Sequence, residues 1–109
     1  MILLWLDDLR DPTEWIPSRY NGYEVVWAKN YDEFVNWINE NGLPDAVSFD
    51  HDLGEEGEYE RSGYTAAKFL VEYCIDNDIP LPLYDCHSAN PVGHDNIIGL
   101  LSNFEKSYL

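Results

Sequence analysis

The sequence has few cations. Six Lys and Arg residues stand against 21 Asp and Glu residues among its 109 residues, which gives a formal net charge of −15 at pH 7. A chain of this charge repels polyanions, so it cannot gather nucleic acid by releasing counterions. We therefore expect no non-specific binding to nucleic acid. Any phosphorylated ligand must be held by local contacts or through a metal ion.

Cysteines are scarce, and long hydrophobic runs are missing. Cys74 and Cys86 lie in apolar segments and lack the spacing of a zinc or redox motif, which favours buried free thiols over a disulfide. No apolar run is long enough for a membrane-spanning helix, and the first residues do not resemble a secretory signal. We expect a cytoplasmic protein that does not bind membranes. Its oligomeric state cannot be read from the sequence.

The composition is that of one compact domain over residues 1–109, with 45% hydrophobic and 15% aromatic residues and no internal repeat or linker. Short apolar runs bounded by acids or turn residues predict strands at 2–6, 23–27, 46–50 and 83–86. Helical periodicity predicts three helices, which follow the capping residues Asn30, Ser62 and Asn90. Residues 9–22 contain two prolines and a turn pair, so an irregular crossover or a short helix is expected there.

This order of elements indicates an α/β fold with a doubly wound, flavodoxin-like parallel sheet of four strands, in the order 2-1-3-4, with helices on both faces. In such sheets the ligand crevice lies beyond the carboxyl ends of the strands, where the strand order reverses. Here that point falls between the first and third strands.

Three polar clusters follow the ends of these strands. They are Asp7 and Asp8 after the first, Asp50, His51 and Asp52 after the third, and His87, Ser88 and Asn90 after the fourth. Carboxylates brought together repel one another, and a divalent cation relieves that repulsion. Ligation by Asp7, Asp8 and Asp50 suits Mg²⁺, whereas recruitment of a histidine favours Mn²⁺, Zn²⁺ or another transition metal. The alternative is that these acids only cap helices or solvate loops.

Two histidines are candidates for proton transfer. His51 and His87 follow neighbouring strands, so their imidazoles could flank one substrate phosphate as general acid and base. Either could instead be a hydrogen-bonded structural residue. The pair His51-Asp52 follows a strand and therefore does not fit the helical HD motif of metal phosphohydrolases.

Phosphate contacts are expected from a helix start and an arginine. The Ser88 hydroxyl, Asn90 and the amide of Gly93 lie where the last helix begins, a place that attracts phosphate, although plain capping is the alternative. Arg10 would supply a counter-charge, unless it pairs with a surface carboxylate. The four tryptophans fit a core or its flank better than a base-stacking role, although Trp15, in the crossover, could reach the crevice.

Together these segments resemble a known family. The motifs are Leu4-Trp5-Leu6-Asp7-Asp8-Leu9-Arg10-Asp11-Pro12, Ser48-Phe49-Asp50-His51-Asp52-Leu53-Gly54 and His87-Ser88-Ala89-Asn90-Pro91-Val92-Gly93 followed by Asn96-Ile97. They look like the cyclic-phosphate processing receiver-like family, over nearly the whole chain. The resemblance implies a reduced receiver fold, with activity on cyclic phosphate ends of RNA or on related nucleotides.

The resemblance also implies roles for single residues. Asp7 and Asp8 match the acid pair of receivers that holds Mg²⁺, Asp50 matches the phosphoacceptor aspartate, and Ser88 matches the hydroxyl residue after the fourth strand. The additions to the receiver pattern are the candidate catalytic residues His51, Asp52 and His87.

One departure from the receiver pattern bears on function. Ordinary receivers have a fifth strand that ends in a lysine, whereas beyond Ser88 this sequence predicts one helix and contains one lysine, Lys106. His94 also stands where a basic residue is expected in the family, which puts one phosphate contact in doubt.

We therefore expect a metal-dependent phosphoesterase, a phosphoric ester hydrolase that uses Mg²⁺ or Mn²⁺ and takes a cyclic-phosphate nucleotide or RNA end as substrate. A non-catalytic nucleotide-binding or acidic protein-interaction module is the alternative. A phosphoacceptor receiver in signalling comes third, because the lysine of ordinary receivers is missing.

Overall fold

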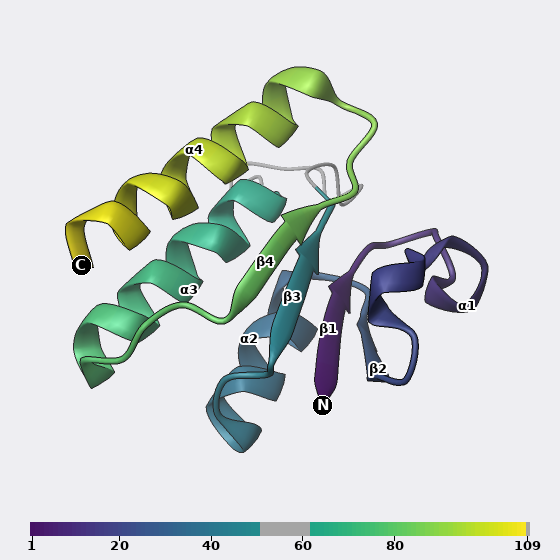
Figure 1. Cartoon of the computed structure of the whole chain (residues 1–109), viewed down its shortest axis with the longest axis horizontal. Helices are drawn as coiled ribbons and strands as arrows, with labels where there is room; N and C mark the ends of the chain where they lie inside the picture. Colours follow the sequence, from purple (N-terminus) through teal and green to yellow (C-terminus); the bar gives the residue numbers. More distant parts are fainter. Residues whose placement is uncertain (51–61, 109) are drawn as a thin grey trace.

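The computed structural model describes residues 1–50 and 62–108. Its centre is a parallel sheet of four strands, β1 (Ile2–Leu6), β2 (Glu24–Ala28), β3 (Ala46–Phe49) and β4 (Leu83–Cys86), in the order β2-β1-β3-β4 (Figure 1). The predicted α/β fold and strand order are confirmed. Two strands differ slightly from their predicted bounds: β2 begins and ends one residue later than predicted, and β3 ends one residue earlier.

Three long helices follow the expected capping residues. They are α2 (Tyr31–Asn41), α3 (Gly63–Asn77) and α4 (Pro91–Tyr108). The Asn30 side chain accepts a hydrogen bond from the amide of Glu33 at 2.8 Å, and Ser62 forms a reciprocal capping box with Thr65. The crossover after β1 contains a short helix, α1 (Pro12–Trp15), and a 3₁₀ turn, η1 (Ser18–Tyr20). None of the described helices is long and apolar enough to cross a membrane.

The two faces of the sheet are covered unequally. Side chains of Leu4, Leu6, Val47 and Phe49 form one core with α2, α3 and α4, so all three long helices pack on the same face. Leu3, Trp5 and Ala46 point to the opposite face, where they pack with Tyr20 of η1 and with Ile16. The three long helices therefore cover one face, whereas the other face is covered by the short crossover through its 3₁₀ turn. The polar residues that follow the strand ends lie on the side of this second face.

Hydrogen bonds continue beyond the strand ends and align three polar residues. The amide of Asp50 donates to the carbonyl of Leu6 at 2.9 Å, and the amide of His87 donates to the carbonyl of Phe49 at 2.9 Å. Leu6 pairs with Phe49, and Phe49 pairs with Cys86. Asp7, Asp50 and His87 are thus successive members of one row across the sheet. Side chains alternate along a strand, so this row points to the same face as Trp5 and Ser48.

Candidate metal and phosphate site

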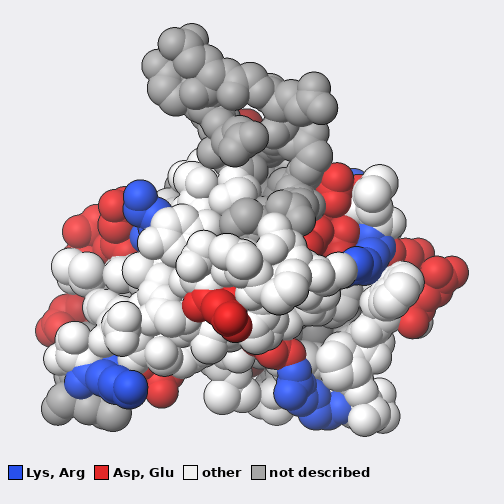
Figure 2. Space-filling view, turned by 90° about the horizontal axis from the view of Figure 1, so that it is seen from above, with Lys and Arg blue, Asp and Glu red and all other residues white. Residues whose placement is uncertain are grey.

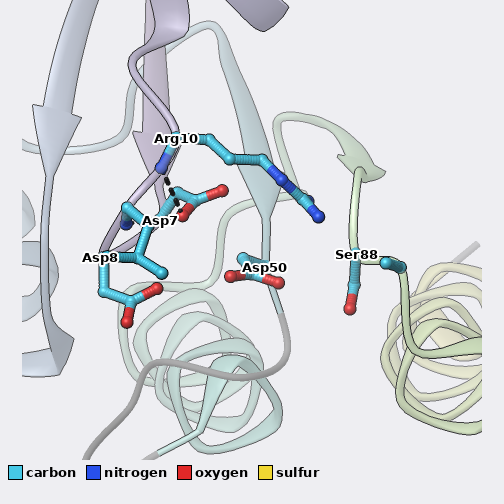
Figure 3. Close-up of a pocket in the computed structure, with 7 residues that line it drawn as sticks. Asp7, Asp8, Arg10, Asp50 and Ser88 are labelled. Atoms are coloured by element: carbon cyan, nitrogen blue, oxygen red, sulfur yellow. Dashed lines mark hydrogen bonds between the residues drawn. The ribbon is translucent and has the colours of Figure 1, made fainter.

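A cavity of about 340 Å³ lies beyond the ends of β1, β3 and β4. Asp7, Asp8, Arg10, Asp50 and Ser88 line it, together with Leu9 and Ala89 (Figure 3). One carboxylate oxygen from each of the three aspartates lies within 4.8 Å of the others. The crevice predicted between the first and third strands is therefore present, and it brings the two separate acid clusters together.

Local backbone geometry fixes Asp7. Its Oδ1 accepts hydrogen bonds from the amides of Leu9 and Arg10, each at 2.9 Å, which closes a tight turn directly after β1. Figure 3 marks the second of these bonds. The backbone carbonyl of Asp7 accepts a bond from the indole Nε1 of Trp27 at 2.7 Å. Asp7 is 1% exposed, so a buried carboxylate is held in one orientation at the base of the cavity.

His87, which follows β4, contacts Asp7 across the end of β3 on the same face of the sheet. Its Nε2 lies 3.0 Å from Asp7 Oδ2, and its Nδ1 lies 2.7 Å from the hydroxyl oxygen of Ser48. Its ring stacks on Trp5, with 3.8 Å between centroids and 5° between planes. Burial lowers the pKa of His87 to about 4, although the hydrogen bond and the negative charge of Asp7 act in the opposite direction.

The hydrogen bonds assign the tautomer of this neutral imidazole. A carboxylate only accepts, so Nε2 carries the proton and donates to Asp7, while Nδ1 accepts the proton of the Ser48 hydroxyl. Both ring nitrogens are thus engaged. The geometry makes His87 a positioning residue for Asp7, and its predicted proton-transfer role stays a prediction.

Sequence reasoning did not identify two of the groups that hold this site. Ser48 is fully buried within an apolar strand, and Trp5 is fully buried beneath the His87 ring. The single polar residue in an otherwise apolar buried strand was the signal that could have pointed to Ser48, because a buried hydroxyl needs a partner. No pattern in the sequence marks Trp5 as a stacking partner, since its place in an apolar run fits any core residue.

Arg10 is the one basic residue among the described groups that line the cavity. Its side chain extends over Asp7 in the direction of Ser88 (Figure 3), and its Nη1 donates to the backbone carbonyl of His87 at 3.0 Å. The guanidinium carbon also lies 5.2 Å from the ring centroid of Trp15. Arg10 is therefore placed within the site rather than in a surface ion pair, with further N–H donors left for a ligand.

The start of α4 mainly caps itself. Asn90 Oδ1 accepts the amide of Gly93 at 3.0 Å, and the Ser88 hydroxyl oxygen accepts the amide of Asn90 at 3.1 Å. The amide of Gly93 thus donates its hydrogen bond within the helix cap, which is the capping role given above as the alternative to phosphate binding. The hydroxyl proton of Ser88 can still be donated to a ligand in the cavity. His94 contacts its neighbour Asp95 at 3.4 Å and does not line the cavity.

The donor set fits a hard divalent cation. Three carboxylates and one guanidinium line the cavity, so the charge of these groups is −2. Two of the carboxylates, Asp7 and Asp50, are buried. Oxygen ligands that carry negative charge are what Mg²⁺ and Mn²⁺ bind in proteins. His87 is turned to Asp7 and Ser48, and it offers no free nitrogen as a ligand.

Two candidate catalytic residues, His51 and Asp52, lie outside the described residues.

The two cysteines are described, and both Cys74 and Cys86 are buried free thiols, as expected. Burial raises the pKa of Cys74 to about 11, so its thiol stays protonated near neutral pH.

Among the residues that the structure describes, the basic side chains visible in Figure 2 form no continuous surface. Figure 2 looks down on the end of the molecule to which the strand arrows point in Figure 1, and the Lys and Arg side chains visible there stand in small separate groups. This distribution agrees with the expectation that any phosphate is bound by local contacts.

Comparison with known proteins identifies a family. The sequence profile of the cyclic-phosphate processing receiver domain matches residues 2–103. None of the curated proteins matches the chain significantly in sequence.

Two solved structures share the fold. One is a fusion protein that contains amino acids 181–211 of the yeast Spc42 trimeric coiled coil, with a TM-score of 0.60 and 22% identity over 91% of this chain. The other is NtrX from Brucella abortus, with a TM-score of 0.53 and 18% identity over 98% of this chain. The match spans 61% of the first protein and 27% of the second.

Proposed function

Since the chain belongs to the cyclic-phosphate processing receiver domain family, we propose that it is a metal-dependent phosphoesterase that opens cyclic phosphates of nucleotides or of RNA ends. The observation that carries this proposal is the convergence of Asp7, Asp8 and Asp50, whose carboxylate oxygens lie within 4.8 Å of one another beside Arg10. A phosphodiester is an anion, and this chain has a net charge of −15, so a positive centre must be built locally.

Asp7, Asp8 and Asp50 would hold the metal ion, which is Mg²⁺ or Mn²⁺ in this proposal. When bound, the ion supplies positive charge that attracts the phosphate and stabilises the charge that develops as the ester bond breaks. Hydrogen bonds from two backbone amides and from His87 fix Asp7 before any ion arrives. A ligand that is already oriented loses little freedom on binding, and partners of this kind strengthen metal affinity.

The remaining cavity groups act on the phosphate oxygens and on protons. Arg10 donates N–H groups to a non-bridging oxygen, and the Ser88 hydroxyl, which lies across the cavity from Asp7 and Asp8 (Figure 3), donates to another. We assign proton transfer between water and the leaving oxygen to His51, assisted by Asp52, because His87 has both nitrogens engaged. Asn90 and Gly93 keep Ser88 and the start of α4 in place.

Turnover of a substrate panel tests this proposal. The purified protein is incubated with cyclic mononucleotides, cyclic oligonucleotides and RNA that ends in a 2′,3′-cyclic phosphate, each with Mg²⁺, with Mn²⁺ or with EDTA, and products are separated by chromatography. We expect metal-dependent ring opening of at least one substrate. The variant Asp50→Asn should lower that rate by about 100-fold or more.

The variant Asp76→Asn is the matched control, because it removes one carboxylate from the exposed surface of α3. It should turn over substrate like the wild type. No turnover of any substrate with either metal, or turnover that Asp50→Asn leaves unchanged, would contradict the phosphoesterase.

A second function fits the position of Asp50. This aspartate follows β3, is 8% exposed and faces the same cavity as Ser88, which is the arrangement expected of a phosphoacceptor in signalling. Incubation with acetyl phosphate and Mg²⁺ followed by mass spectrometry distinguishes the two functions. We expect no phosphoryl group on the protein, because no lysine is among the described residues that line the cavity. A stable phosphorylated form that Asp50→Asn lacks would favour the receiver function.

A further inference from the structure

An aromatic side chain stands exposed beside the site. Trp15, the last residue of α1, is 57% exposed, and Leu9, which lines the cavity, is 83% exposed. The other three tryptophans are used by the fold. Trp5 is buried under His87, Trp27 donates to the Asp7 carbonyl, and Trp37 packs against the main core. Trp15 is therefore not a core residue.

Arg10 connects Trp15 to the phosphate site. Its guanidinium carbon lies 5.2 Å from the Trp15 ring centroid, while its Nη1 is bonded to the backbone of His87 at the end of β4. The same guanidinium lines the cavity with the three aspartates. The same guanidinium group therefore contacts the indole of Trp15 and lines the cavity in which a phosphate would accept its N–H groups. In a nucleotide, one ribose separates the phosphate from the base.

The backbone that carries Trp15 is firmly placed. Asp11 caps α1 by accepting the amide of Thr13 at 2.9 Å, and Pro12 at the first helical position is buried. The amide of Ile16 donates to the carbonyl of Pro12 at 2.9 Å, and the Ile16 side chain packs against the second core. An aromatic ring held on a fixed backbone offers a large contact area at a low cost in conformational entropy.

We infer that the exposed indole of Trp15 stacks on the base of the substrate, so that the preferred substrates are nucleoside cyclic phosphates rather than cyclic phosphates without a base. This inference rests on the proposed phosphoesterase site. The charge of the chain supports it, because a molecule with a net charge of −15 gains nothing from long-range attraction to a polyanion. Stacking does not depend on charge, and it tolerates any base because every base has a π-face.

Two ligands that differ in the base test this inference. Adenosine 2′,3′-cyclic phosphate and glycerol 1,2-cyclic phosphate both carry a five-membered cyclic phosphate, but only the first has a base. Binding to the wild type, Trp15→Ala and Trp15→Phe is measured by calorimetry with Ca²⁺ as the ion, and kcat/KM is measured with Mg²⁺ or Mn²⁺. Circular dichroism checks that each variant is folded.

We expect the wild type to prefer the adenosine ligand by about 5- to 100-fold, the range of one stack between a base and an aromatic ring. Trp15→Ala should abolish most of that preference without changing the affinity for the glycerol ligand, and Trp15→Phe should restore part of it. Trp37→Ala removes a tryptophan from α2 and should keep the preference of the wild type.

Four results would overturn the inference. If Trp15→Ala keeps the preference for the adenosine ligand, Trp15 does not contact the base. If it weakens both ligands equally, Trp15 only positions Arg10. Neither of these two results would contradict the proposed phosphoesterase function. If neither ligand binds to the wild type, or if Asp50→Asn binds both as the wild type does, the proposed site itself is wrong and the inference fails with it.

Discussion

At the scale of single residues, the arrangement around His87 decides how the site is built. One imidazole bridges a buried serine on β3 and the first aspartate after β1, and it stacks on a buried tryptophan. The Ser48 hydroxyl and the burial of the ring favour the neutral imidazole, because protonation would leave Nδ1 without the Ser48 hydroxyl as its donor and would place a charge where little water can reach it. Asp7 acts in the opposite direction, but burial has the larger effect. Because His87 is neutral, it does not offset the negative charge of the three aspartates, and that charge attracts a cation.

The pKa of His87 predicts how stability depends on pH. The folded protein holds this pKa at about 4, below the ordinary value of 6.5, mainly because the ring is buried. Between pH 6.5 and 4 the unfolded chain therefore binds a proton that the folded chain does not, so the free energy of unfolding decreases as the pH falls through this window. The complete loss is roughly 3 kcal/mol, and nothing is lost from this group above pH 6.5.

Urea unfolding of the metal-free protein across this pH range measures the effect. His87→Gln cannot take up the proton and should show a smaller slope between pH 6.5 and 4 than the wild type. Equal slopes for the two proteins would contradict the assignment. An NMR titration of the ring, which should not protonate above about pH 5, gives a second reading.

At the scale of elements, the end of α3 contains an unfavourable residue. Asp78 follows the helix with φ 52° and ψ 52°, and it is the one described residue other than glycine with a positive φ. Its amide and that of Ile79 bond back to the carbonyl of Cys74, which closes the helix and directs the chain into the segment before β4. Left-handed backbone costs an ordinary L-residue about 1–2 kcal/mol, and a negative charge at this end of a helix is also unfavourable.

Asp78→Gly should therefore stabilise the protein by about 1 kcal/mol, because glycine adopts the left-handed conformation without the clash at Cβ. Asp76→Gly is the matched control. It removes the same charge two residues earlier, within α3, where glycine weakens the helix. Chemical denaturation of both variants checks this prediction. An equal change in the two variants would mean that charge, and not backbone conformation, determines stability at this end of the helix.

At the scale of the whole molecule, excess negative charge opposes folding. A net charge of −15 is confined within a radius of gyration of 13.0 Å. At 0.01 M salt the screening length is about 30 Å, so all of these charges interact, whereas at 1 M it is about 3 Å and only neighbours do. The unfolded chain spreads the same charge over a larger volume. Salt therefore removes a repulsion that is larger in the folded state.

We expect the melting temperature to rise by about 4–8 °C between 0.01 and 1 M NaCl, which corresponds to roughly 1 kcal/mol for a domain of this size. Choline chloride at the same ionic strength should have a similar effect, because screening does not depend on the identity of the cation. Differential scanning fluorimetry compares the two salts in the presence of EDTA. A melting temperature that does not change with NaCl would contradict this account of the charge.

The sequence by itself determined the order and the kind of the elements. Apolar runs that stop at acids, the capping residues Asn30 and Ser62, and the breaks at glycine and proline are local signals, because each acts on its own neighbours in the chain. Parallel pairing and the order 2-1-3-4 followed from rules of chain connection. The same rules predict that Asp7, Asp8 and Asp50 lie together at the strand ends.

Only the tertiary structure decided which groups those residues contact. The stack of Trp5 on His87, the bond from Ser48 and the capping of Gly93 by Asn90 depend on the direction of side chains across neighbouring strands and at a helix start. The exposure of Trp15 depends on where the crossover meets the sheet. Strand register and side-chain packing act between segments far apart in the chain, and no spacing within the sequence encodes them.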